Sequence, residues 1–302
     1  MKVLVTGATG MIGREIVKEL MLTGYKVCFL TTSVAKLDSI PKAKGFLWNP
    51  SKNEIDETCF EGVKTIIHLA GSSIAKRWTK SYKAHILKSR TVSAKLLFTT
   101  LEQIQHNVTH FISASAVGKY PPSLSNYYTE DMPETANNFL GEVVEKWEAA
   151  ADMFKTIGIN VCKIRIGLVL SAKGGALEKL VTPIKYYMGT PLASGKQWQS
   201  WIHLQDLAAI FVHALRFKLE GVYNAVAPEP VTNQELTKAI AKQLNKPILP
   251  VHIPAFLLYL MLGEMAVMVT EGQYVSAEKI LNEKFYFQYS NVHQALKNIL
   301  VN

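Results

Sequence analysis

The stretch Val5-Thr6-Gly7-Ala8-Thr9-Gly10-Met11-Ile12-Gly13 places a glycine at every third position near the start of the chain. The run Lys2–Val5 before it predicts a strand, and the apolar face over Met11–Thr23 after it predicts a helix. Glycines in such a turn permit a tight bend and a close backbone approach, and the first N–H groups of a helix attract phosphate. The stretch therefore predicts a pyrophosphate-binding turn, with expected contacts at Gly7, Thr9, Gly10, Met11, Ile12 and Gly13.

Strands and helices continue to alternate as far as residue 164. Further strands are predicted at Tyr25–Thr31, Lys44–Trp48, Thr65–Leu69, His110–Ser113 and Asn160–Ile164, and helices at Trp78–Thr99 and Phe139–Phe154. Unbroken apolar strands that alternate with helices are typical of a parallel sheet covered by helices. After Arg165, glycines and prolines break this rhythm before a helix at His203–Phe217 and a strand at Val222–Val226. His203, at the start of that helix, is expected to be a helix cap or a contact to the following lobe rather than a catalytic base.

Length and composition exclude several classes of protein. The 302 residues suggest two folding units, or one large α/β domain with an appendage, and 48% hydrophobic content excludes a disordered chain. The apolar run Ile253–Gly263 is shorter than the roughly 20 residues of a membrane helix. No signal peptide or membrane partner is expected, so we expect a cytoplasmic protein. The scattered Cys28, Cys59 and Cys162 favour neither a disulfide framework nor a zinc site.

The net charge of +9 comes mainly from one cation-rich segment, residues 63–101, which contains no acidic residue. Its lysines are not confined to one helical face, so most of them are expected to be solvated. Arg77 and Arg90 are suited to hold a phosphate. No nucleic-acid motif accompanies the charge and the histidines lack metal-ligand spacing, so neither a nucleic-acid partner nor a metal is expected.

The end of the second predicted strand indicates which dinucleotide is preferred. An acidic residue there would accept the ribose hydroxyls of NAD, but the strand ends Leu30-Thr31-Thr32-Ser33 and the first acid is Asp38. A 2′-phosphate would meet hydroxyl groups and a lysine instead. NADP(H) is therefore predicted over NAD(H), which stays open, with contacts at Thr31, Thr32, Ser33 and Lys36.

Distinctive short motifs run along the whole chain. They are Val5-Thr6-Gly7-Ala8-Thr9-Gly10, His68-Leu69-Ala70-Gly71, Arg77-Trp78, Ser89-Arg90, Ser113-Ala114-Ser115-Ala116, Trp147-Glu148, Arg165-Ile166-Gly167-Leu168-Val169-Leu170, Gly174-Gly175, Ser200-Trp201-Ile202-His203-Leu204-Gln205-Asp206, Tyr223-Asn224 with Pro228, and Gly263-Glu264. Together they resemble the extended, atypical short-chain dehydrogenase/reductases of the NAD-dependent epimerase/dehydratase superfamily. Within it, they are similar to the epimerase family proteins that carry a C-terminal domain of unknown function.

The resemblance implies an α/β fold: a Rossmann-type, doubly wound parallel sheet that carries NADP(H), with a smaller C-terminal α+β substrate lobe. The implied sheet domain spans residues 1–168, with 203–227 returning to it, and the lobe spans 169–202 and 228–302. A small-molecule substrate is implied, with phosphorylated and nucleotide-linked compounds among the candidates, and a homodimer stays open. The further implied cofactor contacts are Leu69, Ala70, Gly71, Arg90, Ser113, Arg165, Gly167 and Leu168.

The sequence departs from the general dehydrogenase pattern at the catalytic residues. Such enzymes generally use a Tyr with a Lys four residues later as general acid–base, but none of the 12 tyrosines here has that Lys. The positions expected for the pair hold Leu140 and Val144, and the resembled group generally lacks the pair too. The remaining catalytic candidates are Ser115, Lys119 and Tyr120. An oxidoreductase or epimerase and a non-catalytic NADP(H)-binding sensor therefore both remain open.

Overall fold

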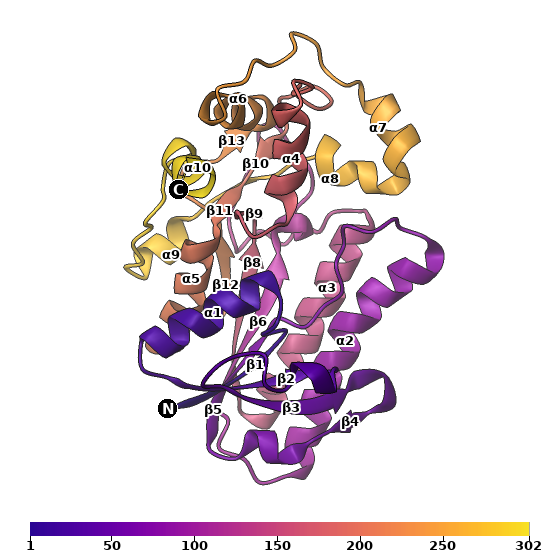
Figure 1. Ribbon diagram of the computed structural model, residues 1–302. Coiled ribbons are helices and arrows are strands. Elements are labelled where there is room, and N and C mark those ends of the chain that lie inside the picture. The colour runs from indigo at the N-terminus through magenta and orange to yellow at the C-terminus, as the bar shows by residue number, and fades with distance from the viewer. Residues whose placement is uncertain (302) are drawn as a thin grey trace.

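A central sheet with helices on both faces dominates the computed structural model, which describes residues 1–301 (Figure 1). Its strand order is β12-β8-β6-β5-β1-β2-β3-β4, and every neighbouring pair is parallel except β3 and β4. In that order the strands are Gly221–Ala225, Asn160–Ile166, His110–Ala116, Val63–His68, Lys2–Thr6, Lys26–Thr31, Lys44–Asn49 and Glu54–Ile55. The fold is therefore the Rossmann-like α/β fold that the sequence predicts.

The two faces of the sheet are covered by different helices. On one face lie α1 (Met11–Leu22) and α5 (Leu204–Phe217), and on the other lie α2 (Lys80–Gln103) and α3 (Phe139–Asp152) (Figure 1). Side chains alternate along a strand. Val3 and Val5 of β1 accordingly pack in the core with Ile16 of α1, whereas Leu4 packs with Leu97 of α2. Burial on both faces explains the unbroken apolar runs of the strands.

Caps set several helix boundaries. The side chain of Thr79 accepts a hydrogen bond from the backbone N–H of Tyr82, so α2 begins after Thr79 and not at Trp78. His203 caps α5 by accepting a hydrogen bond from the N–H of Gln205, which is one of the two roles expected from the sequence. The final helix, α10, spans Val292–Val301.

A second core lies beyond the carboxyl edge of the sheet, in the upper part of Figure 1. Residues from both sides of segment 203–227 build it, among them Leu170, Leu177, Leu236 and Leu296, while that segment itself supplies α5 and β12 to the main sheet domain. The elements of this upper part are β9 (Leu168–Leu170), α4 (Ala176–Lys185), β10 (Trp198–Gln199), β11 (Trp201–His203), β13 (Val231–Thr232), α6 (Asn233–Gln243) and α10.

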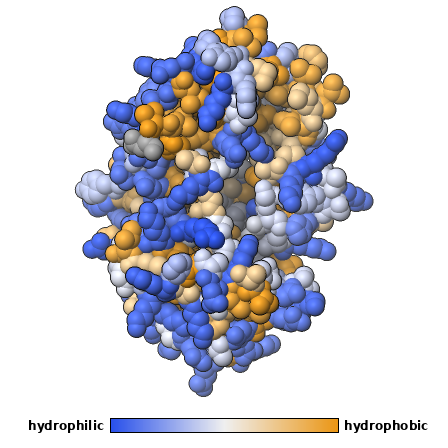
Figure 2. Space-filling model, in the orientation of Figure 1, coloured by the Kyte–Doolittle hydropathy of each residue, from blue (hydrophilic) through white to orange (hydrophobic). Residues whose placement is uncertain are grey.

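The apolar run Ile253–Gly263 forms helix α7 (Ala255–Leu262), in which only Leu258 is buried. Its exposed side chains contribute to the hydrophobic area at the upper right of Figure 2. Short elements follow or connect the others: α8 (Val267–Thr270), α9 (Glu278–Asn282), β7 (Tyr127–Tyr128), β14 (Tyr274–Val275), and the 3-10 turns Val34–Lys36, Pro50–Lys52, Glu57–Phe60, Val117–Lys119, Met153–Ile157 and Gly263–Ala266. Within residues 1–301, no helix combines the length and apolarity needed to cross a membrane.

Candidate functional site

The glycine turn between β1 and α1 has a shape that side chains would block. Gly7 has φ +68°, and a Cβ there would lie 2.9 Å from the carbonyl carbon and oxygen of Leu69. A Cβ at Gly13 would lie 2.2 Å from the carbonyl oxygen of Gly7. Gly10 precedes α1 and has no side chain to cap the helix, so the first N–H groups of α1 stay available to an anion.

A buried hydrogen-bond chain fixes the loop that faces this turn. The hydroxyl of Thr6 accepts hydrogen bonds from the N–H groups of Leu69 and Ala70, each at 3.1 Å, so its own proton goes to Nδ1 of His68 at 2.9 Å. Because Nδ1 of His68 accepts this proton, the proton of the neutral ring is assigned to Nε2, which donates to Ser93 Oγ at 3.2 Å. Burial lowers the pKa of His68 to about 4, so this imidazole is neutral and structural.

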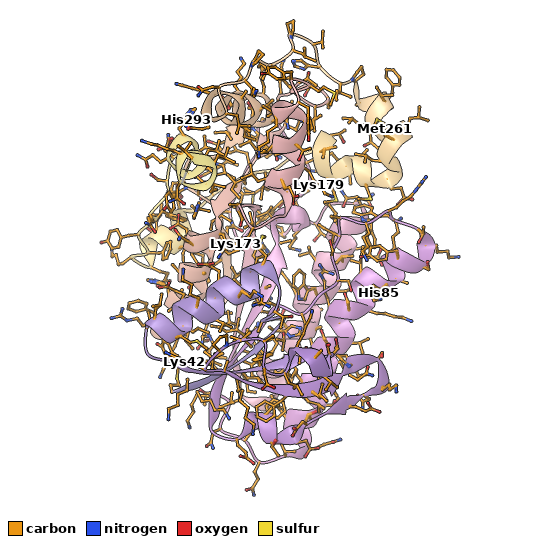
Figure 3. The ribbon with its side chains drawn as sticks, viewed as in Figure 1. Lys42, His85, Lys173, Lys179, Met261 and His293 are labelled. Atoms are coloured by element: carbon orange, nitrogen blue, oxygen red, sulfur yellow. The ribbon has the colours of Figure 1, made fainter. Side chains whose placement is uncertain are left out.

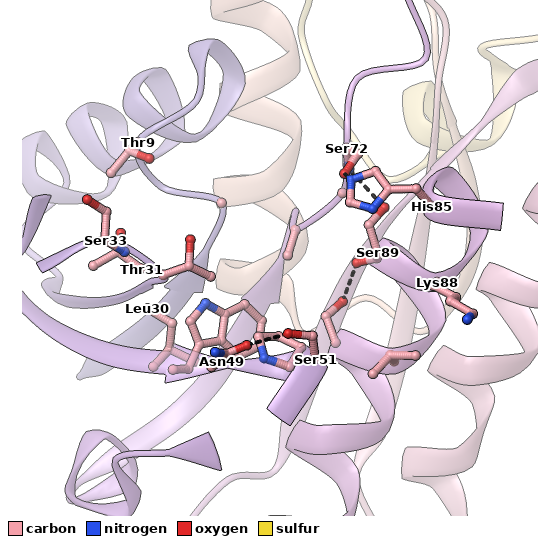
Figure 4. Close-up of a pocket in the computed structure, with 18 of the residues that line it drawn as sticks. Thr9, Leu30, Thr31, Ser33, Asn49, Ser51, Ser72, His85, Lys88 and Ser89 are labelled. Carbon is pink, nitrogen blue, oxygen red and sulfur yellow. Dashed lines mark hydrogen bonds between the residues drawn. The ribbon is translucent and has the colours of Figure 1, made fainter. Parts of the chain in front are cut away.

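A pocket of about 700 Å³, here named the turn pocket, opens beside the glycine turn at the carboxyl ends of β1, β2, β3 and β5 (Figure 4). β1 lies between β2 and β5, and the chain crosses over β1 after β3; ligands of open α/β sheets bind at such switch points. Among the described residues that line the pocket there are two lysines and a histidine and no carboxylate. Its walls are Gly7, Thr9, Leu30–Ser33, Lys36, Trp48–Ser51, Ala70–Ser72, His85, Lys88, Ser89, Val92 and Ser93.

Most sequence-predicted cofactor residues meet around this pocket, and several unpredicted ones join them. Gly7, Thr9, Thr31–Ser33, Lys36, Ala70 and Gly71 line it, Leu69 packs against Gly7, and Gly10–Gly13 form the turn and the start of α1. The unpredicted walls come from the end of β3, where Ser51 donates to Asn49 at 2.7 Å, and from α2. On α2, His85 Nε2 lies 2.7 Å from Ser72 Oγ. One sequence signal could have found the β3 residues: β3 was predicted as a parallel strand, and the carboxyl ends of neighbouring parallel strands lie at the same edge of the sheet.

A glycine-containing loop approaches the start of α1 from the second core. Lys173 Nζ lies 2.6 Å from Glu15 Oε2, and a Cβ at Gly175 would lie 3.4 Å from the methyl carbon of Met11. Lys173 therefore lies beside α1, with His85 across from it on α2 (Figure 3). Between α1 and α2 the molecular face is hollowed (Figure 2).

A second, smaller pocket of about 210 Å³, here named the inner pocket, lies next to the turn pocket. Gly167, Leu168 and Arg90, all sequence-predicted, belong to its walls. The complete set of wall residues is Ile74, Arg90, Ala116–Gly118, Asn138, Leu140, Val143, Val144, Trp147, Ile166–Leu168, Trp198–Ser200, Val267, Met268 and Glu271–Gln273.

Arg90 stands between the two pockets. Its Nη1 donates to the carbonyls of Ser72 at 3.2 Å and Ile86 at 3.0 Å, and its guanidinium lies 4.8 Å from the centroid of the Trp147 ring. Gly71 fits over it, since a Cβ there would lie 3.1 Å from Arg90 Cζ. Burial lowers the pKa of Arg90 to about 10, so it stays charged at neutral pH. Nε of Arg90 and Nε1 of Trp147 are buried donors without a protein partner, which suits an acceptor-bearing ligand.

Apart from Leu69 and the turn residues Gly10–Gly13, five more predicted residues line neither pocket: Ser113, Ser115, Lys119, Tyr120 and Arg165. Ser113 and Arg165 were expected to contact the cofactor. Ser115, Lys119 and Tyr120 were the catalytic candidates. Ser113 is buried and donates to the carbonyl of Ala114, and Lys119 Nζ donates to Thr135 Oγ1 at 2.7 Å. The polar groups of Ser113 and Lys119 thus already have hydrogen-bond partners within the protein.

The other three residues form one buried polar network. Ser115 Oγ donates to Glu148 Oε1 at 2.6 Å, and Arg165 binds both oxygens of that carboxylate. Arg165 Nη1 also donates to the hydroxyl of Tyr120 at 2.7 Å, and Tyr120 donates to Asn224 Oδ1 at 2.9 Å. Burial is the main reason that the pKa of Tyr120 is raised, so this fully buried phenol stays protonated. The network joins α3, β6, β8 and β12, and none of these side chains lines either pocket.

Comparison with known proteins places this geometry in a family. Residues 3–225 match the NAD dependent epimerase/dehydratase family. The chain belongs to this family. In this epimerase/dehydratase family member, residues 253–299 match a domain of unknown function, DUF1731, which follows the first match along the chain.

Relatives of this family member match it over nearly their whole length. An epimerase family protein of Staphylococcus saprophyticus is 35% identical over 300 residues, 98% of each chain. The crystal structure of human epimerase family protein SDR39U1, described as solved with NADPH, is 28% identical, covers 100% of both chains and has a TM-score of 0.86. UDP-glucose 4-epimerase of Thermus thermophilus, at 18% identity and 99% coverage of both chains, has a TM-score of 0.80 and shares the fold.

The positions expected for the Tyr and Lys of the wider superfamily lie in the inner pocket of this family member. They hold Leu140 and Val144, two apolar walls of that pocket. Neither side chain can exchange a proton. Any proton transfer in this pocket must therefore use another residue. Among residues 1–301, no group of three or more histidine, cysteine or acidic side chains is placed to hold a metal ion.

Proposed function

We propose that this epimerase/dehydratase family member binds NADP(H) in the turn pocket and acts as an oxidoreductase or epimerase on a small molecule in the inner pocket. The observation that carries the proposal is a pocket of about 700 Å³ at the glycine turn, with two lysines and no carboxylate among its described walls. The bound nicotinamide would supply the hydride chemistry.

Residues of the turn pocket suit two parts of NADP(H), the pyrophosphate and the 2′-phosphate. The turn at Gly7, Gly10 and Gly13 leaves room for a pyrophosphate at the open N-terminus of α1. Thr32 and Lys36 are exposed at the end of β2, where a 2′-phosphate would meet donors and a positive charge. The human relative described as solved with NADPH supports the same preference. NAD(H) lacks the 2′-phosphate, so we expect it to bind more weakly.

A second candidate is a non-catalytic sensor in which NADP(H) occupancy controls an interaction. Leu140 and Val144 in the inner pocket favour it, because they replace the usual proton-transfer pair with apolar side chains. The second pocket and its unpartnered donors at Arg90 and Trp147 favour an enzyme, since a pure sensor has no need of a substrate pocket.

Calorimetric titration with NADPH and NADH tests the cofactor. We expect NADPH to bind at least about tenfold more tightly, about 1.4 kcal/mol, and absence of saturation with either would refute the proposal. Mass spectrometry of gently purified protein would identify any retained dinucleotide. Single-turnover absorbance at the reduced-nicotinamide band, with a panel of metabolites, then separates the two functions. Bound cofactor that no compound oxidises would favour the sensor.

A further inference from the structure

The inner pocket offers very few groups that can exchange a proton. Among its described walls, the ionisable side chains are Glu271 and Arg90, and there is no tyrosine, lysine, histidine or cysteine. Arg90 keeps its proton at neutral pH and donates to the carbonyls of Ser72 and Ile86. Of these two ionisable walls, Glu271 is therefore the one that can both give and take a proton.

The hydroxyl of Ser200 in the same pocket is already committed. Ser200 Oγ donates to the carbonyl oxygen of Gln273 at 2.7 Å and accepts from the N–H of Val275 at 3.1 Å. The amides of Asn138, Gln199 and Gln273 neither gain nor lose protons in this pH range. Elimination among the wall residues thus leaves Glu271.

Glu271 is positioned by a residue that is itself fixed. Asn138 Nδ2 donates to Glu271 Oε2 at 3.4 Å, while Asn138 Oδ1 accepts from the N–H of Gly141 at 3.0 Å and so caps α3. Glu271 is partly buried, and this burial raises the pKa of its carboxyl more than the Asn138 hydrogen bond lowers it. A carboxyl of raised pKa in a mostly apolar site is a common form of general acid–base.

The size and charge of the inner pocket limit its substrate. Its volume of about 210 Å³ is below the roughly 300–1,000 Å³ typical of pockets for drug-sized ligands. Its side walls are mostly apolar, as at Leu140, Val143, Val144 and Met268. A nucleoside diphosphate carries charged phosphoryl groups and a base, for which this pocket offers one cation and too little room. The walls fit a small, uncharged and largely apolar molecule with one polar oxygen.

We propose that Glu271 is the proton-transfer residue of the inner pocket, and that the substrate is a small, uncharged, largely apolar alcohol or carbonyl compound, not a nucleotide-linked sugar. The proposal rests on the proposed cofactor function. When an alcohol is oxidised, the Glu271 carboxylate takes the hydroxyl proton as the C=O bond forms, and the carbon-bound hydrogen leaves with its electron pair to oxidised NADP. In reduction, protonated Glu271 gives its proton to the carbonyl oxygen as hydride from NADPH reaches the carbon.

Cyclohexanone and UDP-glucose are suitable probes. Trp147 and Trp198 line the inner pocket, so their fluorescence reports binding without any cofactor. We expect cyclohexanone, and not UDP-glucose, to change this fluorescence, and we expect it to be reduced when NADPH is present. If the intact protein neither binds nor reduces cyclohexanone, or if UDP-glucose binds the pocket instead, this inference is overturned. Calorimetric binding of NADPH would still uphold the proposed cofactor site.

Glu271→Gln tests the residue, and Glu264→Gln is the matched control. Glu264 is an exposed carboxylate on the same stretch of chain, where it pairs with Lys83 outside both pockets. In Glu271→Gln we expect the rate of cyclohexanone reduction to fall about 100-fold or more, while NADPH binding and cyclohexanone-induced fluorescence stay within about threefold of the original. Glu264→Gln should leave the reduction rate, NADPH binding and the cyclohexanone-induced fluorescence change unaltered. A Glu271→Gln variant that retains its rate refutes the assignment.

Discussion

Arg165 of β8 and Glu148 of α3 form a bidentate ion pair in the interior, with Nε to Oε1 at 2.8 Å and Nη2 to Oε2 at 2.9 Å. Arg165 is 3% exposed and Glu148 is 7% exposed. Parallel hydrogen bonds of this kind are among the strongest that side chains make. The pair ties α3, which supplies walls to the inner pocket, to the sheet beneath it.

Breaking this pair should destabilise the protein strongly. We expect Glu148→Gln or Arg165→Met to lower the free energy of unfolding by about 3–5 kcal/mol, because each leaves its partner buried without a counter-charge. Urea denaturation measures the loss. The exposed pair Lys146–Glu142 is the control, and Glu142→Gln should cost less than about 1 kcal/mol. A stable Arg165→Met variant that no longer binds NADPH would instead support the cofactor role predicted from the sequence.

Tyr120→Phe distinguishes a structural phenol from a catalytic one. Its hydroxyl lies between Arg165 and Asn224, so its removal should leave Asn224 Oδ1 without this donor and cost about 1–3 kcal/mol of stability. Turnover per folded molecule should stay the same, as measured by reduced-nicotinamide absorbance and urea denaturation together. An inactive variant of undiminished stability would restore Tyr120 as the proton donor.

The turn pocket, the proposed cofactor half of the candidate site, was predictable because its signal is local. Gly7, Gly10 and Gly13 lie within one strand-to-helix turn, and Thr31–Ser33 end the next strand, so pattern and spacing alone bring them to one edge of the sheet. The alternation of strands and helices predicted the parallel sheet for the same reason.

The inner pocket was not predictable because its residues meet only through the tertiary fold. Asn138 and Glu271 are 133 positions apart, and no periodic pattern links them. Arg165 shows the other limit: the pattern places it at the end of β8, but successive side chains on a strand point to opposite faces. Ile166 reaches the inner pocket, whereas Arg165 turns to Glu148.

Gly13→Ala should weaken the proposed cofactor site, and Gly24→Ala is its control. The added Cβ at Gly13 would collide with the carbonyl of Gly7, so the turn must shift and we expect about 1–3 kcal/mol of destabilisation with NADPH binding weakened at least about tenfold. Gly24 has φ +85° and open space around it. Its alanine variant should lose about 1–2 kcal/mol from backbone strain alone and keep its NADPH affinity in calorimetry. Equal affinities of the two variants would contradict this role of Gly13.

Thr32→Asp should reverse the dinucleotide preference. A carboxylate at the end of β2 would repel a 2′-phosphate and accept the ribose hydroxyls of NADH. We expect NADPH affinity to fall by about tenfold or more, with NADH affinity unchanged or higher, in parallel calorimetric titrations. Lys36→Ala should lower the affinity for NADPH and leave that for NADH unchanged. Lys95 is exposed on α2 outside the turn pocket, so Lys95→Ala should alter neither affinity. If neither Thr32→Asp nor Lys36→Ala changes the affinity for NADPH, the 2′-phosphate binds elsewhere.

Acid should destabilise the protein partly through Glu148. Burial by itself raises the pKa of Glu148, but the hydrogen bonds and charge of Arg165, with the Ser115 hydroxyl, outweigh burial and hold that pKa below its usual value of 4.5. As the pH falls, the unfolded chain therefore takes up this proton before the folded protein does, so the stabilisation is present above the usual value and is lost as the pH falls through the lowered one.

Urea denaturation between about pH 7 and about pH 3 should show this loss as a fall in the free energy of unfolding. Glu148→Gln cannot bind the proton, so its curve should fall less steeply than that of the original protein. Other carboxylates with lowered pKa values, such as Asp152, remain in both proteins and cancel in the comparison. Identical slopes for the two proteins would mean that the bidentate pair does not set the acid response, although its contacts would still hold α3 to the sheet.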